Sequence, residues 1–74
     1  MKTIDINGET YPAIAAAQLQ NGMTYWDGSE IVNARTSGKT TKFTLIFDGG
    51  QVDRAVRSQS LIALSHSQVA VLIA

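Results

Sequence analysis

Glycine-containing turn signals recur along this chain and divide it into short segments. They are Asn7-Gly8, Asp27-Gly28, Ser37-Gly38-Lys39 and Asp48-Gly49-Gly50. Glycine, asparagine and aspartate dominate tight turns because they accept backbone conformations that other residues avoid. Short strand-like segments separated by such turns are typical of a small antiparallel barrel or roll. We therefore expect a mainly β protein.

The size and composition of the chain fit one such domain. Its 74 residues allow a single hydrophobic core and no second domain. With 45% hydrophobic and 16% charged residues, the chain is too apolar to be disordered and poorer in charge than most globular proteins. A core of this size supplies no more than about 3–5 kcal/mol. We therefore expect the chain to associate with copies of itself.

Several classes of protein are excluded by what the sequence lacks. Without cysteine there is no disulfide framework, no thiolate zinc site and no cysteine nucleophile. No run approaches the roughly 20 apolar residues that span a bilayer, so no membrane partner is expected. Residues 1–6 mix charged with apolar side chains and lack the apolar centre of a signal peptide. The expected location is therefore the cytoplasm.

The first turn signal predicts an N-terminal β-hairpin. Asn7-Gly8 lies between two alternating segments, and both residues tolerate the positive φ of a type I′ turn. A two-residue turn places Ile6 opposite Glu9 and Ile4 opposite Tyr11. The two isoleucines and the tyrosine then share one face of the hairpin.

A short helix is expected over residues 12–20. Pro12 has no N–H to donate, so we expect it to end the hairpin ladder and to begin the helix. The alanine-rich stretch that follows has a high helix propensity, and Gly22 stands where a helix would stop. Ile14 and Leu19 would face inward.

The middle of the chain predicts a small antiparallel sheet. Its strand-like segments are 24–26, 30–36, 42–47 and 51–57. Phe43, Leu45 and Phe47 alternate with less apolar residues and mark one face of the clearest strand. In the last segment, strict alternation would place Arg54 on the same face as the apolar residues two positions before and after it. Either a bulge shifts the register, or the Arg54 stem packs along the rim of the core with its head group paired.

The tail carries no charge after residue 57. We expect a turn or 3₁₀ segment at Leu61–Leu64 and a strand at Val69–Ile73. Both faces of that strand are apolar, so it is buried on both sides or lies at a subunit interface. The residues expected to mediate self-association are Val69, Val71, Leu72 and Ile73.

Together these segments resemble an SH3-like small β-barrel over residues 19–74. The resemblance rests on Leu19–Met23, the Asp27-Gly28 turn, the strand 30–36, Phe43–Gly49 and Leu61–Leu64. It implies a single domain in which residues 1–22 form a hairpin plus helix and residues 23–74 form the barrel. Domains of this kind bind RNA, DNA or peptides, or assemble as rings, and many serve as accessory modules.

No catalytic or metal-binding pattern is present. His66 is flanked by Ser65 and Ser67, but neighbouring residues of an extended chain point to opposite faces. Gly38-Lys39-Thr40 resembles the end of a phosphate-binding loop, yet Asn33 stands where that loop needs glycine. With one histidine and no cysteine, the remaining candidate metal ligands are carboxylates, and these do not have the spacing of a calcium-binding loop. We expect no enzyme, no cofactor and no metal.

Basic residues concentrate in the middle segment. Residues 31–57 hold five cations against two acids, whereas residues 1–30 hold one cation against four acids. These cations could meet phosphate groups if neighbouring strands bring them together, and exposed aromatic residues could stack on bases. The candidate residues for binding nucleic acid or another anion are Arg35, Lys39, Lys42, Arg54, Arg57, Tyr25 and Trp26.

Three functions are therefore open. The favoured one is a non-enzymatic accessory protein that acts through protein–protein interaction and self-assembly. Its expected partners are further copies of itself, in a homo-oligomer, and another protein. The first alternative is nucleic-acid binding through a basic hairpin face. The second is an oligomeric sponge for a small anionic ligand such as a nucleotide, held in an inter-subunit pocket lined by arginine and tyrosine.

Overall fold

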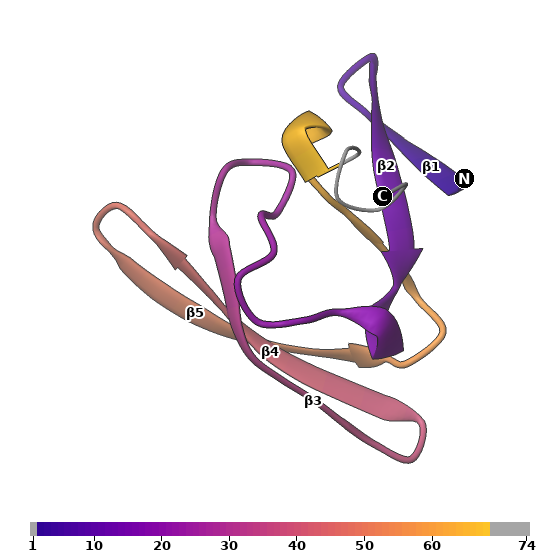
Figure 1. The fold of residues 1–74 in the computed structure, drawn as a ribbon, viewed down its shortest axis with the longest axis vertical. Coiled ribbons are helices and arrows are strands. Elements are labelled where there is room, and N and C mark those ends of the chain that lie inside the picture. Colours follow the sequence, from indigo (N-terminus) through magenta and orange to yellow (C-terminus); the bar gives the residue numbers. More distant parts are fainter. Residues whose placement is uncertain (1, 69–74) are drawn as a thin grey trace.

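Six strands form two antiparallel sheets in a computed structural model that describes residues 2–68 (Figure 1). In chain order the elements are β1 Lys2–Ile6, β2 Glu9–Ala15, the 3₁₀ helix η1 Ala16–Gln18, β3 Glu30–Ser37, β4 Thr40–Phe47, β5 Gly50–Arg57, β6 Leu61–Ala63 and the 3₁₀ helix η2 His66–Gln68. One sheet has the order β1–β2–β6 and the other β3–β4–β5. The mainly β prediction is confirmed, but the described residues form two open sheets rather than a closed barrel.

The N-terminal hairpin follows its turn chemistry. Asn7 and Gly8 have φ values of 52° and 82°, as a type I′ turn requires. Ile6 pairs with Glu9 and Ile4 pairs with Tyr11. The predicted hairpin and its register are therefore confirmed.

The helix expected over residues 12–20 is wrong. β2 continues to Ala15, and only the single turn η1 follows; no α-helix occurs in the described part of the chain. Ala13 pairs with Lys2 of β1 on one side and with Ala63 of β6 on the other. Pairing on both sides outweighs the helix preference of alanine, which is below about 1 kcal/mol per residue relative to most residues.

Pro12 does not end the hairpin ladder, contrary to expectation. The closing pair Ile6–Glu9 is hydrogen-bonded in a two-residue hairpin and the pairs alternate from there, so Pro12 and Thr3 form a pair without backbone hydrogen bonds. The Pro12 carbonyl points to the other side and accepts a 2.8 Å hydrogen bond from the Leu64 N–H. The nitrogen of Pro12 therefore points to the side of β6, opposite a position just after that strand has ended at Ala63, so no ladder hydrogen bond of β6 is lost.

The meander of β3, β4 and β5 confirms the predicted central sheet. β4 pairs with both neighbours, and the β4–β5 register runs without interruption from Thr40–Arg57 to Phe47–Gly50. No bulge therefore shifts Arg54, which lies opposite Phe43 and is exposed. The one irregularity lies in β3, between Val32 and Arg35.

The tail differs from expectation where it is described. The segment predicted as a turn at Leu61–Leu64 contains strand β6, which pairs with β2, and the 3₁₀ turn comes later, in η2. The predicted strand Val69–Ile73 lies outside the described residues, and so do its proposed self-association residues Val69, Val71, Leu72 and Ile73. That part of the hypothesis stays a prediction.

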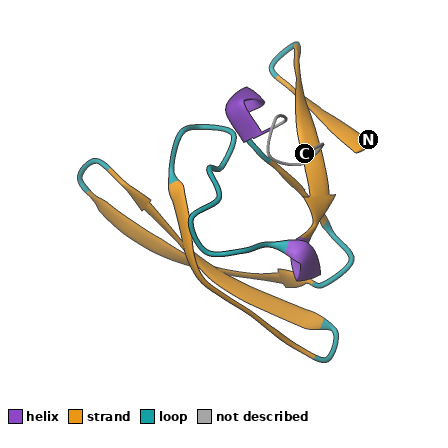
Figure 2. Cartoon of the chain, viewed as in Figure 1, coloured by secondary structure: helices purple, strands orange, loops and turns teal. Residues whose placement is uncertain are grey.

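The loop of residues 19–29 joins the two sheets (Figure 2). The Ile31 N–H of β3 bonds to the Met23 carbonyl, and the Trp26 N–H bonds to the Ala63 carbonyl of β6. The strand expected at residues 24–26 is reduced to isolated bridges, among them Tyr25 with Leu64. Because the loop bonds to both sheets, it holds them around one core. The core residues are Ala16, Leu19, Ile31, Phe43, Leu45, Ile62 and Leu64.

Candidate basic face and free strand edge

Alternate residues of the second sheet point to opposite faces. Phe43 and Leu45 are buried and mark the core-facing side. The pairing registers of β3, β4 and β5 place three of the five predicted cations on the opposite, outer face. These are Arg35, Lys42 and Arg57, and we call them the basic face.

A β-bulge decides on which side Arg35 lies. The β3–β4 register shifts between Val32 and Arg35, and Asn33 adopts a positive φ of 55° there. Two residues of β3 then oppose one residue of β4. Without the extra residue, Arg35 would share the core-facing side with Ile31, because residues an even number apart lie on one face of a regular strand. The bulge turns Arg35 outward, beside Lys42.

The three cations of the basic face are neighbours. Arg35 and Lys42 are direct cross-strand partners, and Arg57 lies opposite Thr40, two positions along β4 from Lys42. Directly opposed side chains have Cβ atoms about 4.5–5.5 Å apart. Within residues 2–68 no carboxylate lies within ion-pair distance of Arg35, Lys42 or Arg57, although Asp53 lines one depression together with Arg35 and Lys42.

All five predicted cations line shallow depressions of the second sheet. A depression of about 240 Å³ lies between Arg35 and Lys42, and another of about 270 Å³ lies between Lys39 and Arg57. A third, of about 290 Å³, is lined by Arg35, Lys42 and Arg54 together with the carboxylate of Asp53. The structure therefore places Arg35, Lys42 and Arg57 on one face, whereas Lys39 lies in a turn and Arg54 lies on the Phe43 side of the sheet.

The predicted aromatic residues lie elsewhere. Tyr25 packs against the core, and Trp26 lies with its ring centroid 5.6 Å from that of Tyr11. Trp26 precedes β3, whereas Lys39 follows it, so the eight residues of this strand separate them by roughly 25 Å. Tyr25 and Trp26 therefore do not join the basic face.

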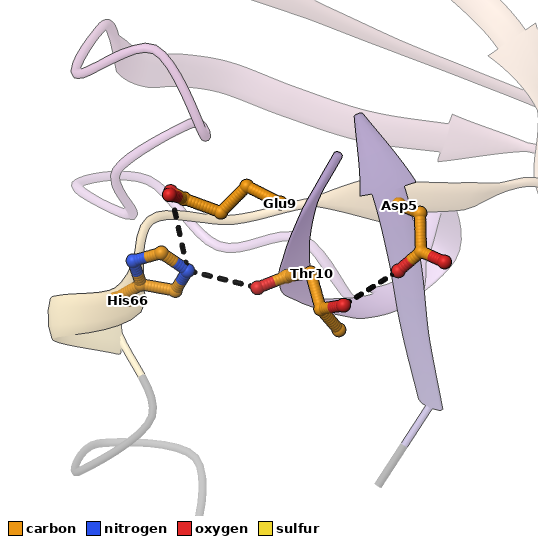
Figure 3. Close-up of polar contacts among 4 residues, drawn as sticks. All are labelled: Asp5, Glu9, Thr10 and His66. Atoms are coloured by element: carbon orange, nitrogen blue, oxygen red, sulfur yellow. Dashed lines mark hydrogen bonds and ion pairs between the residues drawn. The ribbon is translucent and has the colours of Figure 1, made fainter. Parts of the chain in front are cut away.

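His66 fastens η2 to the N-terminal hairpin (Figure 3). Its Nε2 lies 2.8 Å from the Thr10 carbonyl oxygen and 3.7 Å from Glu9 Oε2. Because a carbonyl only accepts, Nε2 carries the proton and donates it. The Tyr11 ring stacks on the imidazole with centroids 4.7 Å apart. His66 therefore joins η2 to the distant N-terminal hairpin, while Ser65 and Ser67 hydrogen-bond to each other.

The pKa of Tyr11 tests how close Glu9 lies to this ring. Hydrogen bonding to Glu9, together with burial and the Glu9 charge, raises the pKa of Tyr11 above its usual 10.0. In a Tyr25→Phe background, Glu9→Gln removes the negative charge that opposes phenolate formation, so the pKa of Tyr11 should fall toward 10.0. Ultraviolet titration of tyrosinate measures it. Asp5→Asn, which changes a carboxylate bonded to Thr10, should leave the pKa of Tyr11 in place.

β5 leaves one edge of the second sheet open. It is the last strand in the order β3–β4–β5. Counting from the closing pair Phe47–Gly50, every second residue directs its backbone groups toward β4. The intervening Gln51, Asp53 and Ala55 direct their N–H and C=O groups outward, and all three are exposed. No other strand within residues 2–68 pairs with this edge.

The opposite end of the second sheet has a different character. Ile46, Phe47 and Val52 are 40%, 46% and 41% exposed, and they surround the β4–β5 turn. Phe47 lies opposite Gly50, whose lack of a side chain leaves the ring uncovered on that strand. The basic residues and this apolar tip therefore occupy opposite ends of one sheet. The open edge of β5 could not be predicted from the sequence, because strand order is decided by pairing between distant segments.

Several other site types are not seen in the described residues. Within residues 2–68 no three histidine, cysteine or acidic side chains are grouped so that they could hold a metal ion. No helix in that range is long and apolar enough to cross a membrane. No protein-family model, no curated protein and no solved structure matches the chain.

Proposed function

We propose that this chain is a non-enzymatic accessory protein that acts by pairing with a second copy of itself along β5. The open edge at Gln51, Asp53 and Ala55 is the observation that carries the proposal. Unpaired backbone groups on a strand edge are a template for another strand. A second copy offers the same template in the opposite direction around a two-fold axis.

The charge pattern of β5 favours its own copy as the partner. A two-fold axis perpendicular to the sheet keeps the outer faces of both copies on the same side. Centring the pair on Ala55 places Asp53 of each copy opposite Arg57 of the other, so opposite charges meet twice. Centring it on Asp53 or on Arg54 would bring like charges face to face, which is destabilising.

Ala55→Pro tests the edge directly. The substitution removes an N–H that points away from the sheet and leaves the bonds between β5 and β4 in place. We expect a folded monomer where the unaltered chain is a dimer. Native mass spectrometry and sedimentation velocity report the subunit number, and circular dichroism reports the fold.

A charge exchange provides the matched control. Asp53→Arg should weaken dimerisation about tenfold or more, because two opposite-charge pairs worth about 0.2–1 kcal/mol each become repulsive. Adding Arg57→Asp to the same chain should restore it. The proposal fails if the unaltered chain stays monomeric at every accessible concentration, or if Asp53→Arg leaves dimerisation unchanged.

A second candidate function is binding of nucleic-acid phosphate groups. It is favoured by the neighbouring positions of Arg35, Lys42 and Arg57, none of which forms an ion pair with a carboxylate of residues 2–68. The small-ligand alternative keeps less support, since no tyrosine lines the depression at Arg57. The SH3-like resemblance stays a prediction, supported by a three-stranded meander that runs directly into the short β6.

A further inference from the structure

We propose that the paired sheet carries one continuous anion-binding row that recognises the phosphodiester backbone of a nucleic acid. The inference rests on the self-pairing proposed above. In one copy, Arg35 pairs with Lys42, and Lys42 pairs with Ala55. When Ala55 meets its own equivalent, the row continues through Lys42 and Arg35 of the second copy. Two half-sites then become one site that neither copy has alone.

The spacing of strands sets the length of this row. Adjacent strands lie about 4.7–4.9 Å apart, so the two Lys42 residues are three steps or about 14 Å apart, and the two Arg35 residues are five steps or about 24 Å apart. The two central residues are alanines, whose short side chains do not project between the cations and so do not obstruct a ligand that crosses the strands. A flexible polyanion can therefore lie across the strands and touch four cations in succession.

Other charges of the outer face restrict the path. Asp53 and Glu30 share this face with the basic residues: Asp53 lies opposite Thr44, directly beside the row, and Glu30 lies opposite Ile46, toward the other end of the face. Arg57 is engaged by Asp53 of the second copy in the proposed pairing. A polyanion is therefore repelled from the neighbouring rows and guided along the line through Arg35 and Lys42.

The cations of this row contact the phosphate groups of the nucleic acid and not its bases. The outer-face residues of the three strands include no aromatic side chain, and Tyr25 and Trp26 lie beyond the far end of β3. Base stacking, the usual source of added affinity for single strands, is therefore missing from the row. Affinity should be nearly independent of base sequence and should depend strongly on salt.

Fluorescence anisotropy with labelled oligo(dT) tests the proposal. For about four phosphate contacts, the slope of log K against log salt should be near −3, or roughly a 50-fold loss between about 50 and 200 mM salt. Lys42→Ala removes two of the four cations of a dimer, so the slope should fall to about half. Lys2→Ala removes an exposed cation of the other sheet and should change neither slope nor affinity. A duplex of equal length, run in parallel, distinguishes single-stranded from double-stranded DNA as the source of the phosphates.

Subunit number is measured on the same samples, so the two proposals fail separately. A dimer that does not bind oligo(dT) at low salt, or whose binding ignores Lys42→Ala, overturns the anion row and leaves the pairing intact. A monomer that binds through Lys42 overturns the pairing and with it the two-copy row. Ala55→Pro should yield a folded monomer with about half the salt slope, and a monomer with an unchanged slope contradicts the proposal.

Discussion

A chain carrying Leu64→Ala is expected to be largely unfolded at room temperature. Leu64 is fully buried at the centre of the core, between the two sheets. Truncating a buried leucine to alanine costs about 2–5 kcal/mol, because apolar contact is lost and a cavity remains. A domain of this size has no more than about 3–5 kcal/mol to lose. The backbone bond from Leu64 to Pro12 is not removed by the change, so the effect reports side-chain packing alone.

Leu61→Ala is the matched control for this experiment. Leu61 lies three positions earlier, in β6, and is 36% exposed. Its truncation should cost no more than about 1 kcal/mol, since less apolar surface leaves water on folding. Urea unfolding followed by circular dichroism gives both free energies. Equal losses for the two variants would show that Leu64 is not central to the core.

Thr41→Val is expected to cost about 1–3 kcal/mol although it preserves the shape of the side chain. Thr41 is 1% exposed and donates its hydroxyl proton to Ser58 Oγ over 3.0 Å. Thr36 must then be the donor in its 2.9 Å contact with Thr41, and Ser58 passes its own proton to the Gly38 carbonyl. Valine breaks this chain in the middle, because the Thr36 hydroxyl loses its acceptor and the Ser58 hydroxyl loses its donor.

The neighbouring residue Thr40 supplies the comparison for Thr41. Thr40→Val changes an exposed threonine of the same strand and should alter stability by less than about 0.5 kcal/mol. Urea unfolding measures both variants, and amide exchange should speed up at Gly38 and Lys39 only in Thr41→Val. No difference between the two variants would mean that the hydroxyl chain contributes nothing to stability.

Local turn chemistry explains which elements could be predicted from the sequence. The Asn7-Gly8 turn determines both the first hairpin and its register, because only a two-residue loop of this type joins strands so closely. The alternation around Phe43 and Leu45 likewise predicts β4 and its buried face. In each case the deciding interactions join residues close together in the chain.

The mistakes arise where distant residues decide the structure. Ala13 belongs to a strand because β6 supplies a partner at Ala63, and nothing near residue 13 indicates that partner. Pro12 is tolerated because its nitrogen falls at the end of that same pairing. The convergence of Arg35 and Lys42 could not be predicted either, since it depends on an extra residue in β3 whose only local signal is an asparagine at position 33.

The pairing of β2 with β6 also has a consequence for synthesis of the chain. Ala13 and Ala63 are partners although 50 positions separate them. A ribosome adding about 5–20 residues per second takes roughly 3–10 s to make the intervening stretch. Throughout that interval β2 of the nascent hairpin lacks its partner strand β6. Adjacent ribosomes on one messenger RNA therefore carry incomplete chains that expose the same unpaired strand edge to each other.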